Sequence, residues 1–199
     1  MTKKRAIVSV FDKTGIVGLC IFLHERDWEI VSTGGTAAAL RTANIPVIEM
    51  SDITGFPELL EGRVKTLHPH IHAAILARPT FEHMETLQHF GIHPVDLVVV
   101  NLYPFTQTIA RPNVTIEQAI EMIDIGGPTM LRAAAKNYER VTAVCDPADY
   151  PQLMDCLRKG DVSLAMRWKF ATKVFAHTAA YDASVRDWMQ HVVFPGGAS

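Results

Sequence analysis

The stretch Ala6-Ile7-Val8-Ser9-Val10 decides the fold, because this short β-branched run predicts a buried strand. Apolar residues at helical spacing then predict a helix over 14–26, and a second strand-like run covers 28–32. A helix over 37–43 and a third strand over 45–49 complete a β-α-β-α-β series. Continuously apolar strands joined by helices favour an α/β fold with a parallel sheet flanked by helices on both faces.

The rest of the chain extends this pattern, and Asp96–Asn101 is its clearest buried strand. Further elements are expected as strands over 73–77 and 141–145 and as helices over 81–90, 115–123, 128–137, 147–158 and 163–189. Thr115–Gln118 resembles a capping box, and Pro128 suits a first helical position. The last helix carries an apolar stripe of Leu164, Trp168, Ala171 and Phe175. Residues 51–72 lack a regular pattern, which favours a functional loop.

Composition limits the class of protein. The chain has 199 residues, is 48% hydrophobic and has a formal charge of −2. We expect one domain over 1–199, with C-terminal helices from about residue 147. The balanced charge argues against nucleic acid as a partner, and the short apolar runs argue against a membrane span. Three separated cysteines and a start without a signal peptide predict a reduced, cytoplasmic protein.

The segment 62–72, GRVKTLHPHIH, concentrates histidine and basic side chains. If it were extended, His68, His70 and His72 would share one face, as zinc ligands could. Pro69 interrupts the run and no carboxylate or cysteine is near, so we predict no metal site and histidines that pack within the loop. Two residues apart, Arg63 and Lys65 would point the same way, and with the hydroxyl of Thr66 they suit a phosphate. The alternative is an exposed basic pair.

Other candidate residues follow the predicted strands, at the edge where open parallel sheets bind ligands. The loop Ser32-Thr33-Gly34-Gly35-Thr36 lets a ligand approach the backbone at a helix N-terminus, although such turns are also common structural devices. Lys13, Asn101 and Tyr103 lie beyond two other strands, and Tyr103 could simply pack over the Pro104 turn. Asp124 is a helix N-cap or, with Lys136 on the next helix, part of a proton-handling set.

Taken together, these segments resemble the IMP cyclohydrolase family, the N-terminal domain of a bifunctional purine-biosynthesis enzyme. The resemblance covers about residues 5–188. It is carried by SV-x-DKTG (9–15), STGGT (32–36), TGFPE (54–58), GRVKTLHP (62–69), NLYPF (101–105), IDIGGPTMLRAAAKN (123–137) and HTAAYD (177–182).

The resemblance implies a methylglyoxal synthase-like fold and a cofactor-free closure of 5-formamidoimidazole-4-carboxamide ribonucleotide (FAICAR) to inosine monophosphate (IMP). It implies catalytic roles for Lys65, Tyr103, Asp124 and Lys136. It also implies substrate-binding positions at Lys13, Ser32, Thr33, Gly34, Gly35, Thr36, Arg63, Thr66, Asn101, Ile125, Gly126 and Gly127. His68 would support the site residues without contacting the substrate itself. The family's tendency to dimerise implies a possible homodimer.

Two departures from the family pattern raise questions. The family usually has a small hydroxyl residue where this chain has Phe11, so either other donors bind the phosphate or Phe11 turns into the core. The transformylase domain that normally follows is missing after the unstructured-looking Pro195–Ser199, which fits a stand-alone cyclohydrolase or a truncated protein.

Two alternative functions share the implied fold. Methylglyoxal synthase is one, and the NLYPF and IDIGG segments argue against it. A non-catalytic nucleotide-sensing module, like the allosteric domain of carbamoyl phosphate synthetase, is the other. Such a module need not keep all of Lys65, Tyr103, Asp124 and Lys136.

Overall fold

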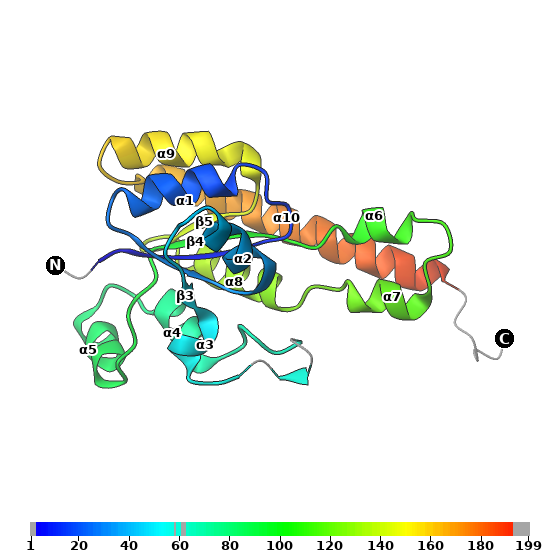
Figure 1. Cartoon of the computed structure of the whole chain (residues 1–199), viewed down its shortest axis with the longest axis horizontal. Helices are drawn as coiled ribbons and strands as arrows, with labels where there is room; N and C mark the ends of the chain where they lie inside the picture. The colour runs from blue at the N-terminus through cyan, green and yellow to red at the C-terminus, as the bar shows by residue number, and fades with distance from the viewer. Residues whose placement is uncertain (1–2, 58, 61–62, 193–199) are drawn as a thin grey trace.

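The fold is built around one parallel sheet of five strands in the order β3-β2-β1-β4-β5 (Figure 1). The computed structural model describes residues 3–57, 59–60 and 63–192, so the expectations for Glu58, Gly62 and Pro195–Ser199 lie outside it. The strands are β1 (Arg5–Val10), β2 (Glu29–Ser32), β3 (Ile48–Glu49), β4 (Leu97–Asn101) and β5 (Thr142–Val144). The predicted α/β class with a parallel sheet is confirmed.

The strands are buried on both sides because helices cover both faces of the sheet. Ala6, Val8 and Val10 of β1 belong to one cluster of buried apolar side chains, together with residues of α1 (Ile16–His24), α2 (Gly34–Thr42) and α9 (Tyr150–Arg158). Ile7 belongs to a second such cluster on the opposite face, together with residues of α4 (Pro69–Leu76), α8 (Gly126–Lys136) and α10 (Leu164–His191). The remaining helices are α3 (Met50–Thr54), α5 (Phe81–His89), α6 (Phe105–Ile109), α7 (Ile116–Glu121) and the short 3₁₀ helix η2 (Pro147–Asp149).

Strand order places a crevice at the carboxyl ends of β1 and β4. From β1 the chain crosses to β2 on one side, whereas β4 lies on the other side and leads on to β5. A sheet whose order reverses in this way opens a crevice at the reversal, beyond the strands' carboxyl ends. The strand order therefore indicates where a sheet of this kind would hold a ligand, before any side chain is considered.

The segment 51–77 differs from expectation. The predicted strand over 73–77 is wrong, because Pro69–Leu76 form helix α4. Pro69 occupies the first turn, where its missing N–H costs nothing, and the His68 ring nitrogen accepts a hydrogen bond from the His70 amide at 3.2 Å. Part of the expected irregular loop is helix α3, which ends at a left-handed Gly55.

One detail of the later helices was also predicted incorrectly. Helix α8 begins at Gly126, so Pro128 is its third residue and not its first. The apolar stripe on α10 does not face the core throughout, because Leu164, Trp168 and Phe175 are exposed and only Ala171 is buried. Trp168 packs its edge on Tyr138, and the guanidinium of Arg132 lies 5.6 Å from the Phe175 ring centre. The capping box at Thr115 and Gln118 is confirmed at the start of α7.

Helices α6 and α7 extend from the body alongside the distal part of α10 (Figure 1). Phe105, at the start of α6, is buried and packs edge-on against Tyr181 and Trp188 of α10. This contact ties the segment that follows β4 to the C-terminal helix. No described helix is long and apolar enough to cross a membrane.

A half-buried arginine, Arg140, closes the other end of the fold. The guanidinium of Arg140 donates to the carbonyls of Ala77 at 2.8 Å, Val95 at 2.9 Å, and Ala74 at 2.5 Å. The Asn137 amide donates to Ile75 and Ala77 at 2.7 and 2.9 Å. These side chains satisfy the last carbonyls of α4, which have no partners within the helix, and they join α4 to α8.

We expect Arg140→Met to lower the free energy of unfolding by about 2–4 kcal/mol, because the Val95 carbonyl would lose its donor and the carbonyls of Ala74 and Ala77 would each lose one of two donors. Chemical denaturation followed by circular dichroism measures this change. The matched control is Arg186→Met, whose exposed pairing with Asp187 is expected to contribute less than about 0.5 kcal/mol. Equal midpoints for the two variants would contradict the structural role of Arg140.

Candidate active site

Asn101 joins the two strands at the crevice. Its side-chain oxygen accepts hydrogen bonds from the amides of Phe11 at 2.6 Å and Asp12 at 2.9 Å, and its amide nitrogen donates to the Asp12 carbonyl at 2.9 Å. The side chain predicted to meet a ligand is therefore bonded to the loop that follows β1. It shapes the crevice by fixing that loop beside β4.

The loop after β1 satisfies most of its own polar groups. The Lys13 ammonium folds back to the carbonyls of Val10 and Phe11, and partial burial lowers its pKa. Asp12 accepts hydrogen bonds from the amide and hydroxyl of Thr14, at 2.9 and 2.6 Å. In this arrangement Lys13 lies at the crevice, with its charge held close to the backbone.

The glycine loop after β2 divides into buried and accessible parts. Ser32 and Thr36 are buried: Ser32 donates to the Val8 carbonyl at 2.7 Å, and Thr36 bonds both backbone groups of Val10. These two hydroxyls hold the loop against β1. Thr33 is the extended residue before α2, and Gly34 and Gly35 form the helix's first turn, whose amides have no partner within the helix.

Lys65 and Thr66 come from a distant loop to this edge of the sheet. A side chain at Gly34, which has φ of 54°, would meet the Lys65 ammonium at 3.9 Å. A side chain at Gly126 would meet the buried Thr66 hydroxyl at 2.6 Å. The two residues therefore place segment 65–66 between the N-terminal ends of α2 and α8. Both helix ends favour negative charge there.

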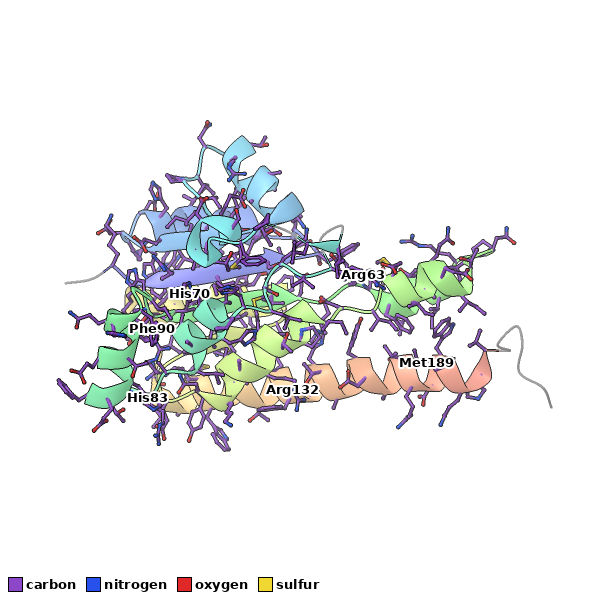
Figure 2. The ribbon with its side chains drawn as sticks, turned by 90° about the horizontal axis from the view of Figure 1, so that it is seen from below. Arg63, His70, His83, Phe90, Arg132 and Met189 are labelled. Carbon is purple, nitrogen blue, oxygen red and sulfur yellow. The ribbon has the colours of Figure 1, made fainter. Side chains whose placement is uncertain are left out.

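Arg63 does not accompany Lys65, because Leu59 and Val64 pair in an antiparallel bridge and the Arg63 amide donates to the Leu60 carbonyl at 3.1 Å. The guanidinium of Arg63 bonds Glu121 of α7 at 2.8 Å on the surface. Figure 2 shows Arg63 where its loop approaches the short helices α6 and α7. The two basic side chains therefore do not point the same way, because Arg63 bonds Glu121 whereas the Lys65 ammonium lies near Gly34.

Asp124 lies at the N-terminus of α8, half-buried beneath the crevice. Its carboxylate accepts hydrogen bonds from the amides of Gly127, at 2.9 Å, and Tyr103. Burial raises the pKa of the Asp124 carboxyl above its usual value, and the two donated bonds only partly offset that effect. Gly127 is required here, since a Cβ atom would lie 2.5 Å from the Asp124 carboxylate and 2.9 Å from Leu102.

Sequence reasoning assigned no role to Tyr181, which holds the Asp124 turn from α10. Its hydroxyl accepts a hydrogen bond from the Asp124 amide at 2.8 Å and donates to the Met122 carbonyl at 3.2 Å. Tyr181 belongs to the HTAAYD segment, which was noted only for its resemblance. A tyrosine 57 residues away has no local signal that links it to Asp124.

Of the two alternatives for Phe11, the one in which its ring turns into the core is wrong. Its side chain is 43% exposed, and its ring packs edge-to-face on Tyr103, with 5.4 Å between the ring centres. Tyr103 is also 43% exposed and stands directly after the β4 segment that carries Asn101. The two rings form one wall of the crevice.

Lys136 lies apart from the other predicted catalytic residues. It is the last residue of α8, ten positions beyond Gly126, and a helix rises about 1.5 Å per residue. About 15 Å of helix therefore separates it from the Asp124 turn. Lys65, Tyr103 and Asp124 lie at the carboxyl edge of the sheet, whereas α8 carries Lys136 toward the opposite edge.

The three histidines do not share a face, because α4 begins between them. His68 caps the helix and packs near Phe56, and the His70 ring lies 3.2 Å from the Ile53 carbonyl (Figure 2). Burial lowers the pKa of His72. Within residues 3–57, 59–60 and 63–192, no three His, Cys, Asp or Glu side chains form a group that could hold a metal ion.

An apolar hollow of about 590 Å³ lies beside the Asp124 turn, between α8 and the distal part of α10. Ile125, one of the predicted binding residues, is 57% exposed at its rim. The hollow is lined by Ile123, Asp124, Ile125, Pro128, Thr129, Tyr181, Asp182, Val185, Arg186, Met189 and Gln190.

Comparison with known families agrees with this architecture. The MGS-like domain model matches residues 15–129, more than half of the chain. The chain belongs to the MGS-like domain family. A second model, the AICARFT/IMPCHase bienzyme, matches residues 134–197, which include the end of α8 and all of α10. The MGS-like match runs from Gly15 to Thr129, so it includes the crevice residues after β2 and β4 and the Asp124 turn, but begins after β1 and its following loop.

Similar proteins carry related names. "Bifunctional purine biosynthesis protein PurH" of Ruminiclostridium cellulolyticum is 53% identical over 198 residues, and that of Anoxybacillus flavithermus is 56% identical over 193. The match covers 96% of this chain, which spans about 38% of the length of these curated relatives. A solved structure titled "Crystal structure of ForH" has a TM-score of 0.82 and 37% identity, covering 93% of this chain and 98% of that one.

We expect Tyr181→Phe to free the Asp124 turn, because the Asp124 amide and the Met122 carbonyl would both lose their partner. Hydrogen exchange at the Asp124 amide should become at least about 10-fold faster, a change that mass spectrometry can follow. Tyr138→Phe serves as a control, since Tyr138 packs on Trp168 at the other end of α8. Unchanged exchange at Asp124 in Tyr181→Phe would contradict the role given to its hydroxyl.

Proposed function

We propose that this chain is an IMP cyclohydrolase, which closes FAICAR to IMP with loss of water in purine biosynthesis. The observation that carries the proposal is 53–56% identity, over 96% of the chain, to relatives named for purine biosynthesis. The crevice supports it, because it joins two helix N-termini, a lysine and a carboxyl of raised pKa.

In this proposal the substrate phosphate binds at the glycine loop. The amides of Gly34 and Gly35 open α2, and a helix N-terminus favours an anion. Lys65 lies beside the same loop, and Lys13 lies at the neighbouring end of β1. Ser32 and Thr36 would act indirectly, since their buried hydroxyls hold the loop in place.

The reacting end of the substrate would lie against the Asp124 turn. The carboxamide nitrogen attacks the formyl carbon, a C–N bond forms, and the formyl oxygen becomes an oxyanion. Asp124 accepts the proton from the nitrogen, as a carboxyl of raised pKa suits. The Lys65 ammonium stabilises the oxyanion, which takes up the proton held by Asp124. The C–O bond then breaks as the formamido nitrogen forms the ring C=N bond, and the N–H proton that this nitrogen releases completes the leaving water. Tyr103 is a hydrogen-bonding partner, and Thr66, Asn101, Ile125, Gly126 and Gly127 shape the surrounding wall.

The broader setting is part of the same proposal. FAICAR and IMP are the small-molecule partners, a homodimer is the expected assembly, and the cytoplasm is the expected location. No cofactor takes part in the proposed steps, because proton transfer and oxyanion stabilisation are within reach of Asp124 and Lys65.

Direct turnover tests the proposal. The purified chain is mixed with FAICAR, with and without a chelator, and IMP formation is followed by ultraviolet absorbance. We expect turnover that survives chelation. Tight nucleotide binding without turnover would instead support a nucleotide-sensing module, and formation of methylglyoxal from a triose phosphate would support methylglyoxal synthase.

The pH profile should report the state of Asp124. A general base acts in its deprotonated form, so kcat/KM should fall as the pH drops through its pKa. Because burial raises that pKa, the acid limb should lie above the usual aspartate value of about 3.9. Asp124→Asn should remove most of the activity together with this limb. A residual acid limb at the same position would assign it to another group.

Two lysine variants separate the predicted catalytic residues. Lys65→Ala should lower kcat by about 100-fold or more, because an oxyanion would lose its stabilising charge. Lys136→Ala should change kcat by less than about 10-fold, since α8 holds Lys136 some 15 Å away from the Asp124 turn. Equal losses would show that Lys136 reaches the substrate, which the length of α8 does not allow within one chain.

A further inference from the structure

Phe11 is an unusual residue for its place. It stands between β1 and three polar, exposed residues, Asp12, Lys13 and Thr14, at the edge of the sheet that holds the crevice. Its backbone amide is bonded to Asn101 at 2.6 Å, so the start of its side chain is fixed relative to β4. An apolar ring held rigidly on an exposed polar loop contributes little to the core and needs another explanation.

The ring of Phe11 is directed at Tyr103. The two rings meet edge-to-face at 74°, with centres 5.4 Å apart, which is a favourable geometry for aromatic pairs. Tyr103 has its backbone amide bonded to Asp124 and is followed by Pro104, so its main chain is restrained. Its side chain is less restrained, because it is 43% exposed and its hydroxyl makes no side-chain hydrogen bond to the described part of the chain.

We propose that Phe11 is a positioning residue, which acts through Tyr103 by holding the phenol ring in the orientation that catalysis uses. This inference rests on the proposed cyclohydrolase function. The Asn101 bonds set the position of Phe11, the edge-to-face contact sets the rotamer of Tyr103, and the Tyr103 amide joins the pair to Asp124. An exposed side chain otherwise samples several rotamers, and only one of them presents the hydroxyl to the reacting atoms.

The experiment uses Phe11→Leu, which keeps an apolar side chain but removes the aromatic edge, and Phe11→Ser, which removes both. The interaction free energy of an edge-to-face aromatic pair corresponds to a change of about 2- to 12-fold in an equilibrium constant. We expect kcat for FAICAR closure to fall by about 3- to 10-fold in Phe11→Leu, with KM changed less than about 2-fold. The exposed Phe81→Leu on α5 is the matched control, and its kinetics should equal those of the parent.

A double-mutant cycle with Tyr103→Phe gives a readout that a merely structural role would not move. If Phe11 acts by orienting the phenol hydroxyl, Phe11→Leu should have no further effect on kcat once that hydroxyl is absent. Thermal midpoints within about 2 °C across the set would show that folding is not the cause. Additive losses in kcat, or a rise in KM alone, would overturn the proposal, because each would mean that Phe11 contacts the substrate directly.

The outcome is separable from that of the proposed function. If the parent chain does not close FAICAR, the cyclohydrolase proposal fails, and the positioning role that rests on it is overturned with it. If the parent turns over and Phe11→Leu matches it in kcat and KM, the cyclohydrolase stands and the positioning role is overturned.

Discussion

The reversal of strand order between β1 and β4 is the constraint on which the rest of the site depends. It leaves two adjacent strands whose following loops diverge, and the Asn101 side chain joins them with three hydrogen bonds. These bonds fix Phe11 and Asp12 relative to the start of the Tyr103 segment. Every further element of the crevice is placed by reference to this junction, because α2 packs on β1 through Thr36, and Asp124 bonds the Tyr103 amide.

Close backbone approach is the second constraint, and it explains two glycines that a strand-helix turn alone would not require. Gly126 lies against the buried Thr66 hydroxyl and Gly127 against the Asp124 carboxylate. Any side chain at these positions would push the loop carrying Lys65 away from α8 or displace the carboxylate itself. The two glycines therefore allow the loop of Lys65 and the carboxylate of Asp124 to lie close to α8, although these segments are about 60 residues apart in the sequence.

The sequence predicted the sheet well, because buried parallel strands read as continuous apolar runs such as Leu97–Asn101. It predicted α4 poorly, since a short apolar run fits either a strand or a helix, and the Pro69 helix-start signal was interpreted only as an interruption. Their sequence spacing placed Asp124 and Lys136 in one helical segment, but the length of α8 separates the two side chains. Tyr181 could not be found at all, because its contact with Asp124 depends on how α10 packs.

The hydrogen bonds of the crevice decide which groups remain for an anion. Ser32, Thr36 and Asn101 already bond the backbone, and Asp12 bonds Thr14, so the polar side chains near β1 mainly hold their own loop in shape. Lys13 donates to two carbonyls at the end of β1 and would have to leave them to reach a ligand. The first-turn amides of α2 differ, because no carbonyl within the helix can accept from them. An anion at Gly34 and Gly35 would therefore satisfy donors that the helix cannot satisfy internally, beside the ammonium of Lys65. In this proposed mode the anion would not depend on position 11, where this chain has an aromatic ring and its resemblance predicts a hydroxyl.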